Sequence, residues 1–221
     1  MNKDLSVVLL GAGQSKRFQS STLKQNYIIH NKRVIDYSID FFRYHFRATN
    51  KYYVINKKIN IKLLKKNEHS LYGSTSRLKS LNNCLDYILR NNLQTKYTLI
   101  HDIARPVLDI TDVRNILKEI KKSVDGSSLG YPLTNAIKEL KNGKITENII
   151  RSNLWSTFTP QIFKTNKLYE SIKFCIDKRY DIDDDIEALI INNLRCSMVL
   201  SNPCNIKITY KSDIENIKKL L

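Results

Sequence analysis

Apolar residues in the first half of the chain form short runs that alternate with segments of helical periodicity. Residues 7–10 are continuously apolar and end at Gly11, as is typical of a strand buried on both faces of a mainly parallel sheet. Residues 51–56 and 97–101 give two further short strands. Between the strands, residues 34–46 and 76–93 carry apolar side chains at helical spacing, and the alternation predicts an α/β fold.

The second half continues this pattern and adds a polar hairpin. Residues 135–151 resemble two short strands that turn at Asn142-Gly143, a dipeptide suited to tight hairpin turns. No repeat or low-complexity linker interrupts the chain, so residues 1–221 are predicted as one domain with an arm at about 135–151. The remaining predicted elements are helices 113–124, 184–194 and 214–221, and strands 128–132, 198–200 and 206–209.

Length and cysteine usage narrow the class of protein. None of the apolar runs in the 221 residues approaches the roughly 20 needed to span a bilayer. The first run, residues 5–10, is too short for a secretion signal and directly follows Asp4. The four cysteines are widely spaced and show no metal-ligand pattern. These features predict a soluble cytoplasmic protein with reduced thiols and no membrane partner.

The net charge of +16 raises the alternative of a basic nucleic-acid-binding module. The lysines are spread over the whole chain, however, and no recognised nucleic-acid motif concentrates them. Nucleic acid is therefore an unlikely partner by this interpretation. A positive field also favours a small phosphate-rich substrate.

The loop after the first predicted strand is the first candidate for chemistry. It runs Gly11, Ala12, Gly13, Gln14, Ser15, Lys16 and Arg17. Small residues allow backbone N–H groups to close around a polyphosphate, while the two cations supply charge. No Gly-Lys-Ser/Thr follows, so the loop is not a P-loop, and a tight turn from strand to helix accounts for it equally well.

Asp102 is the second candidate, because it stands where the strand at 97–101 ends. Pro106 prevents the strand from continuing, and open α/β sheets bind ligands at the carboxyl ends of their strands. An ion pair with Arg105 is a structural alternative for this carboxylate. His101 is interpreted as structural.

Five short blocks in order along the chain carry a family resemblance. Together they resemble the 2-C-methyl-D-erythritol 4-phosphate cytidylyltransferase family, including its ribitol-5-phosphate cytidylyltransferase relatives, over nearly the whole chain. The resemblance implies a Rossmann-like three-layer sandwich with a protruding β-arm, and transfer of CMP from CTP to a small alcohol phosphate with release of pyrophosphate. The blocks are Lys24-Gln25, GSTSRLKS at 73–80, IHDIARP at 100–106, LWSTFTPQIF at 154–163 and NIKIT at 205–209.

On the nucleotide side, the resemblance implies that the loop from Gly11 to Lys16 wraps the triphosphate. Gly73, Arg77 and Ser80 would line the cytosine pocket. Asp102 would hold Mg²⁺, a hard ion that prefers carboxylate oxygens. The groups expected to act on the reacting phosphates are Arg17, Lys24 and Lys207.

On the acceptor side, the resemblance implies positions at Arg105, Ala136, Arg151, Thr159 and Asp183. Arginine's planar fork suits a phosphate. In the family, the arm crosses to a partner subunit and helps to complete this site, so a homodimer is implied.

Two acceptor-side positions depart from the family pattern. Ala136 and Asp183 stand where threonines are expected, and Ala136 cannot donate a hydrogen bond. The default acceptor is 2-C-methyl-D-erythritol 4-phosphate, but these departures favour ribitol 5-phosphate or another polyol phosphate used for a cell-surface polymer. A glycosyltransferase is a further alternative, because Asp181-Ile182-Asp183 has the spacing of a metal motif, although it lies too late in the chain.

Overall fold

The computed structural model describes residues 4–61 and 64–221, and a seven-stranded sheet forms its centre. The strand order is β11-β7-β10-β6-β1-β4-β5. Neighbouring strands are parallel except around β10, which is antiparallel to both β6 and β7. The sheet strands are β1 (Leu5–Gly11), β4 (Asn50–Ile55), β5 (Glu68–Tyr72), β6 (Tyr97–Asp102), β7 (Gly126–Pro132), β10 (Trp155–Lys164) and β11 (Cys196–Leu200).

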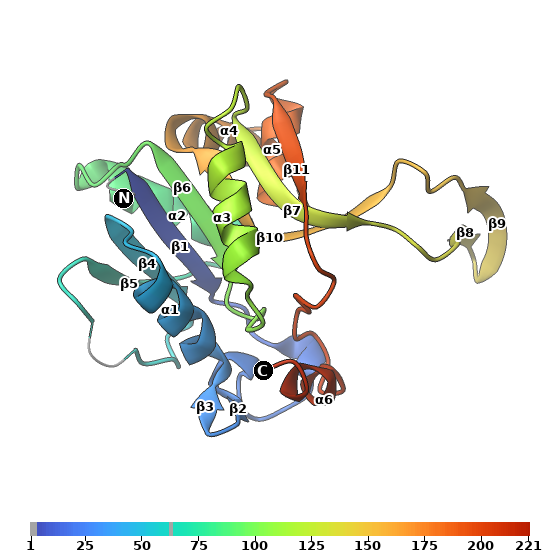
Figure 1. Cartoon of the computed structure of the whole chain (residues 1–221), viewed down its shortest axis with the longest axis horizontal. Helices are drawn as coiled ribbons and strands as arrows, with labels where there is room; N and C mark the ends of the chain where they lie inside the picture. Colours follow the sequence, from blue (N-terminus) through green and yellow to red (C-terminus); the bar gives the residue numbers. More distant parts are fainter. Residues whose placement is uncertain (1–3, 62–63) are drawn as a thin grey trace.

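Helices cover both faces of this sheet, which confirms the predicted three-layer α/β arrangement (Figure 1). One face carries α1 and α3, and the other carries α2, α4 and α5. The helices are α1 (Val34–His45), α2 (Arg77–Arg90), α3 (Ile110–Glu119), α4 (Thr165–Asp177), α5 (Asp185–Ile191) and α6 (Asp213–Lys218).

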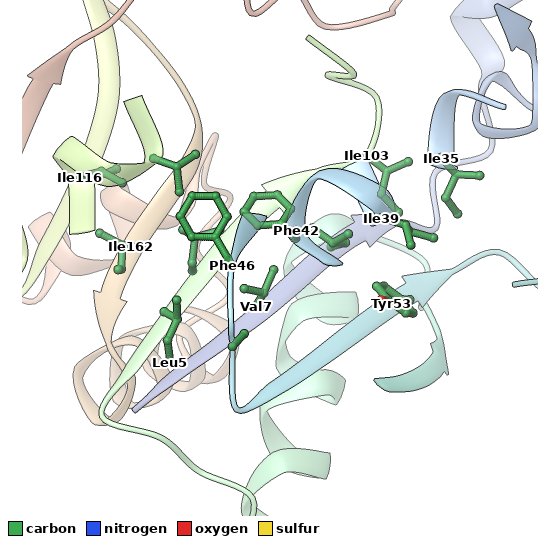
Figure 2. Close-up of a cluster of buried hydrophobic side chains, with 14 of the residues drawn as sticks. Leu5, Val7, Ile35, Ile39, Phe42, Phe46, Tyr53, Ile103, Ile116 and Ile162 are labelled. Atoms are coloured by element: carbon green, nitrogen blue, oxygen red, sulfur yellow. The ribbon is translucent and has the colours of Figure 1, made fainter. Parts of the chain in front are cut away.

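The double covering explains why β1 is continuously apolar from Val7 to Leu10. Leu5, Val7 and Leu9 belong to the core beneath α1 and α3, whereas Val8 and Leu10 belong to the core beneath α2 and α4. Figure 2 shows the first of these cores, in which the rings of Phe42, from α1, and Phe46, directly after α1, lie beside side chains of the sheet. Alternate residues of a strand point to opposite faces, so a strand with two buried faces has no polar face.

A third, smaller core fixes the chain near the carboxyl end of β1. Phe18 and Val34 pack there against Ile208, Ile214 and Ile217, which brings the C-terminal helix α6 beside the segment that follows the first loop. This segment contains η1 (Lys16–Phe18), η2 (Lys24–Asn26), β2 (Ile28–Ile29) and β3 (Lys32–Arg33).

The polar hairpin forms the predicted arm. Its strands, β8 (Ile137–Lys141) and β9 (Lys144–Ile149), pair only with each other among the described strands. Figure 1 shows the hairpin standing away from the sheet at the end of two extended connections. Leu140, Ile145 and Ile150 are exposed on it, the last at 79%.

The sequence pattern was wrong or incomplete in several places. Residues 206–209 form no strand; the segment contacts the chain after β6 through Ile208 N, which donates to Ala104 O (2.8 Å). The pattern missed β5, β10 and α4. In β10 the register with β7 shifts between Phe158 and Gln161, which breaks regular alternation. Within the described residues, no helix is long and apolar enough to cross a bilayer.

Candidate active site

A cavity of about 740 Å³ opens at the carboxyl ends of β1, β4, β5 and β6, the edge at which open α/β sheets bind ligands. The volume is in the range of small-molecule sites. It brings together most of the nucleotide-side residues predicted from the sequence, although they come from segments up to about 200 residues apart. They are Gly11, Ala12, Gly13, Gln14, Ser15, Arg17, Lys24, Gly73, Arg77, Ser80, Asp102 and Lys207.

The first loop is held in place by the segment that follows it. The Gln25 amide donates hydrogen bonds to the carbonyls of Gly11 (2.8 Å) and Gly13 (3.1 Å). Ser15 Oγ accepts from Lys24 N (3.1 Å) and donates to Gln25 Oε1 (3.2 Å). The loop therefore leads into a single 3-10 turn, η1, and not directly into a helix as the alternative interpretation required. Gln25 is 2% exposed, and its role in holding the loop was not predicted.

Glycine is required at residue 73, where the loop after β5 passes close to the loop after β1. A Cβ built on Gly73 would lie 2.0 Å from the Ala12 Cβ and 3.0 Å from Ser80 Oγ. Ser80 Oγ in turn accepts from Ser74 N (2.8 Å) and donates to Ser76 O (2.7 Å). At this wall of the cavity the loops that contain Ala12 and Gly73 therefore lie in close contact.

Asp102 lies at the base of the cavity and is paired on both oxygens. Its Oδ1 accepts from Arg77 Nε (3.1 Å) and its Oδ2 from Lys207 Nζ (2.6 Å). Burial alone would raise the pKa of this carboxyl, but Arg77 and Lys207 hold the pKa well below its usual range. The alternative ion pair between Asp102 and Arg105 does not form, because the Arg105 guanidinium donates to Asn205 O (2.7 Å) instead.

Thr159 lies behind the cavity wall and not on its surface. Its hydroxyl accepts from Asp102 N (3.0 Å) and lies 3.3 Å from His101 Nδ1. His101 is fully buried, and burial lowers its pKa to about 4. The ring is therefore neutral near neutral pH, in agreement with the structural role predicted for it.

Three cationic side chains lie near one another in the cavity. Lys24 Nζ donates to Ile208 O (2.6 Å), and Arg17 and Lys207 line the same cavity. Burial, followed by repulsion from Lys207, lowers the pKa of Lys24 to about 8. Such a concentration of positive charge stabilises a polyphosphate and the charge that develops when it reacts.

The acceptor-side residues are not gathered in this cavity. Ala136, Arg151 and Asp183 are exposed on other parts of the surface, and Ala136 and Arg151 belong to the arm and its base. The side chain of Lys16, predicted to contact phosphate, lies outside the described part of the structure.

The expected Mg²⁺ would have one acidic ligand in this cavity. Among the described residues, no three His, Cys, Asp or Glu side chains gather closely enough to hold a metal ion. Of the residues that the structure describes around the cavity, Asp102 is the one that offers a carboxylate. This fits Mg²⁺, which is commonly bound by one or two carboxylates together with substrate phosphates and water. Lys207 would compete with the ion for that carboxylate.

Comparison with known proteins gives a consistent result over the whole chain. The family model described as 2-C-methyl-D-erythritol 4-phosphate cytidylyltransferase matches residues 5–221. The enzymes of that name from Acinetobacter baylyi and Wigglesworthia glossinidia brevipalpis are 28% and 30% identical to the chain. These alignments cover 98% and 96% of the chain, and 93% of each relative.

Solved structures show the same fold. The enzyme of that name from Francisella tularensis superposes with a TM-score of 0.87 at 22% identity, covering 99% of this chain and 100% of the other. The structure of the Thermus thermophilus enzyme gives 0.82 at 19% identity and covers 98% of both chains.

Proposed function

The chain belongs to the 2-C-methyl-D-erythritol 4-phosphate cytidylyltransferase family, and from this we propose that it transfers CMP from CTP to 2-C-methyl-D-erythritol 4-phosphate and releases pyrophosphate. One observation carries the proposal. The cavity is lined both by the wall at Gly73, where two loops lie in close contact, and by a cluster of cations at Arg17, Lys24 and Lys207. Such a site suits a ligand that is flat at one end and polyanionic at the other.

The chemistry makes few demands on the protein. The acceptor is a phosphate monoester whose second pKa is about 6, so it is already an oxyanion nucleophile near neutral pH. Its oxygen attacks the α-phosphorus of CTP as the bond to pyrophosphate breaks, and no general base is needed. Catalysis then consists of aligning two anions that repel each other and stabilising charge on the transferred group.

The residues of the cavity suit these tasks. Lys24 and Lys207 would neutralise the reacting phosphates, and Arg17 would hold the outer phosphates. The N–H groups of the loop that Gln25 holds would bind the same oxygens. We propose that Asp102 would hold Mg²⁺, which would neutralise part of the charge on the substrate phosphates.

For the acceptor, the similarity to 2-C-methyl-D-erythritol 4-phosphate cytidylyltransferases favours 2-C-methyl-D-erythritol 4-phosphate over ribitol 5-phosphate. Ala136 remains the observation in favour of a different polyol phosphate. Both Ala136 and Arg151 lie outside the cavity of a single chain. We therefore propose a homodimer in which the arm of one subunit completes the acceptor site of the other.

The deciding experiment is pyrophosphate release with Mg²⁺ across the four nucleoside triphosphates and a panel of alcohol phosphates. We expect CTP and 2-C-methyl-D-erythritol 4-phosphate to be preferred. Preference for ribitol 5-phosphate would assign the alternative acceptor, and no release with any pair would contradict the proposed transfer. Light scattering tests the dimer separately, since a monomer at assay concentrations would contradict it.

We propose a cytoplasmic location for this reaction. All four cysteines are free in the structure, and Cys84 and Cys175 are buried, as expected of a protein from a reducing compartment. Fractionation of cells that express the full chain tests this assignment.

A further inference from the structure

One arginine of the cavity, Arg77, links two carboxylates, of which only Asp102 lines the cavity. Arg77 Nε donates to Asp102 Oδ1 (3.1 Å), while its terminal nitrogens donate to Asp185 Oδ1 (2.6 Å) and Oδ2 (2.8 Å). The second contact is the planar, two-bond pairing that arginine forms best. Arg77 therefore shares one positive charge between two anions. Its two-bond contact is with Asp185, the anion outside the cavity.

Asp185 is held in place by its burial and by its position at the start of α5. It is 0% exposed and is the first residue of α5. The preceding residue, Asp184, caps this helix by accepting from Glu187 N (2.9 Å), and it also accepts from the Gln161 amide (2.9 Å). Burial raises the pKa of Asp185, and the two bonds that its oxygens accept from the Arg77 guanidinium counteract this and favour the ionised carboxylate. Asp185 does not line the cavity.

We propose that Asp185 is a positioning residue for the transfer reaction: by holding the terminal nitrogens of Arg77, it keeps the Asp102 carboxylate incompletely neutralised and available to a cation. The proposal rests on the proposed function, in which Asp102 meets the metal of Mg-CTP. Asp102, Arg77, Asp185 and Lys207 together carry no net charge. Once Lys207 turns to the phosphates, the remaining three carry one negative charge, which favours a divalent cation.

Removing the Asp185 charge reverses this balance. In Asp185→Asn the guanidinium keeps its full charge and has only Asp102 as an anionic partner at this site. A buried Arg–carboxylate pair is stronger where water is excluded, so Asp102 would bind Arg77 in place of a metal. Substitution of groups that orient a metal ligand typically weakens metal affinity by roughly 10- to 100-fold.

The test measures binding of a non-hydrolysable CTP analogue by calorimetry, with Mg²⁺ and separately with EDTA. The ratio of the two affinities is the metal-dependent gain and needs no turnover. We expect Asp185→Asn to lower this gain at least about tenfold, in line with outer-shell effects on metal sites, with no loss of affinity in EDTA. A gain within about twofold of the native protein would overturn the proposal.

The chain offers a matched control in a second buried ion pair far from the cavity. Arg43 donates to Glu68 through Nε (2.9 Å) and Nη2 (2.7 Å), and the Glu68 side chain is 0% exposed. Glu68→Gln removes a comparable charge from β5 and should destabilise the protein without changing the metal-dependent gain. An equal loss of gain in both variants would show a general structural effect and overturn the proposal.

A double variant keeps the test usable if Asp185→Asn does not fold. Arg77→Met with Asp185→Leu removes both charges and leaves none buried and unpaired, an exchange that proteins often tolerate. The gain should then be at least that of the native protein, because Asp102 loses the bond from Arg77 and keeps the one from Lys207. Loss of the gain in this variant would overturn the proposal. If the native protein binds no CTP analogue at all, the proposed function itself fails. If the native protein binds the analogue and Asp185→Asn leaves the gain unchanged, the positioning role of Asp185 fails alone.

Discussion

The cavity and the arm differ in how firmly the fold holds their side chains. In the cavity, Gln25, Ser80 and Asp102 are buried, and each makes at least two hydrogen bonds through its side chain. On the arm, β8 and β9 pair only with each other among the described strands, and Ala136 and Arg151 are exposed.

This difference separates the two halves of the proposed reaction. One chain alone forms the cavity that we propose for the nucleotide, because loops from four parallel strands, β1, β4, β5 and β6, meet at one edge of the sheet. The residues predicted for the acceptor are not gathered in this cavity. Substitutions in the cavity should therefore have large effects through charge and packing, whereas substitutions on the arm should have smaller effects confined to acceptor affinity.

The largest effect is expected when the cavity loses one of its cations. Lys24→Met should lower kcat by roughly 100- to 1,000-fold, the usual cost of removing one group that stabilises transition-state charge. Steady-state pyrophosphate release measures it. Lys121→Met, at an exposed lysine outside the cavity, should leave kcat unchanged, and a loss below fivefold in Lys24→Met would contradict the role of Lys24.

The next effect tests the close approach of backbones at the cavity wall. Gly73→Ala places a Cβ 2.0 Å from the Ala12 Cβ, so the first loop must move. Small displacements at a reacting site can cost about 100-fold, and we expect KM for CTP to rise at least about tenfold. Overpacking should also lower the free energy of unfolding by about 1–3 kcal/mol, measured by urea denaturation.

Gly13→Ala is the matched control for stability within the same cavity. A Cβ at Gly13 would meet nothing closer than Gln25 Nε2 at 4.0 Å, so its free energy of unfolding should stay within about 0.5 kcal/mol. Equal destabilisation of the two variants would show that the contact with Ala12 is not the cause.

Sequence reasoning recovered the cavity better than it recovered the contacts behind it. The buried strands β1, β4 and β6 were predictable, because short, continuous apolar runs are typical of strands that are covered on both faces. The strand end also placed Asp102. The pairing of Arg77 with Asp185 was not predictable, since these residues are 108 positions apart and meet only after α2 and α5 pack on the same face of the sheet.

The missed elements have similar physical reasons. β10 pairs with strands on both sides, and its register shifts midway, so its sequence shows no regular alternation. The expected strand at 206–209 is apolar at Ile206 and Ile208 because both residues pack against the small core around α6. Packing of this kind gives the same alternation as a strand.

In the free enzyme, the charge state of Lys24 should change with pH within the range of activity measurements. Its pKa is lowered to about 8 by burial and by Lys207, and a lowered pKa means that the cation loses its proton as pH rises through about 8. We expect kcat/KM to fall above this pH by up to about tenfold per pH unit. The decline in kcat should lie at higher pH, since bound phosphates favour the cation.

Lys24→Arg separates this group from others that titrate nearby. Arginine remains protonated throughout the measurable range, so the decline in kcat/KM near pH 8 should disappear even if the maximal rate is lower. An unchanged decline in the arginine variant would assign the titration to another group.

The smallest expected effect lies on the arm and addresses the acceptor directly. If 2-C-methyl-D-erythritol 4-phosphate is the acceptor, Ala136→Thr restores a hydroxyl where the family resemblance implies a substrate contact. One hydrogen bond contributes about 0.5–1.5 kcal/mol, so KM for this acceptor should fall by roughly two- to tenfold while KM for CTP stays constant. Asn135→Thr, which adds the same side chain one residue earlier, should change neither. If the hydroxyl instead raises KM for 2-C-methyl-D-erythritol 4-phosphate and leaves turnover of ribitol 5-phosphate intact, the arm is adapted to a different polyol phosphate, and the contrast between a fixed nucleotide site and a variable acceptor site becomes sharper.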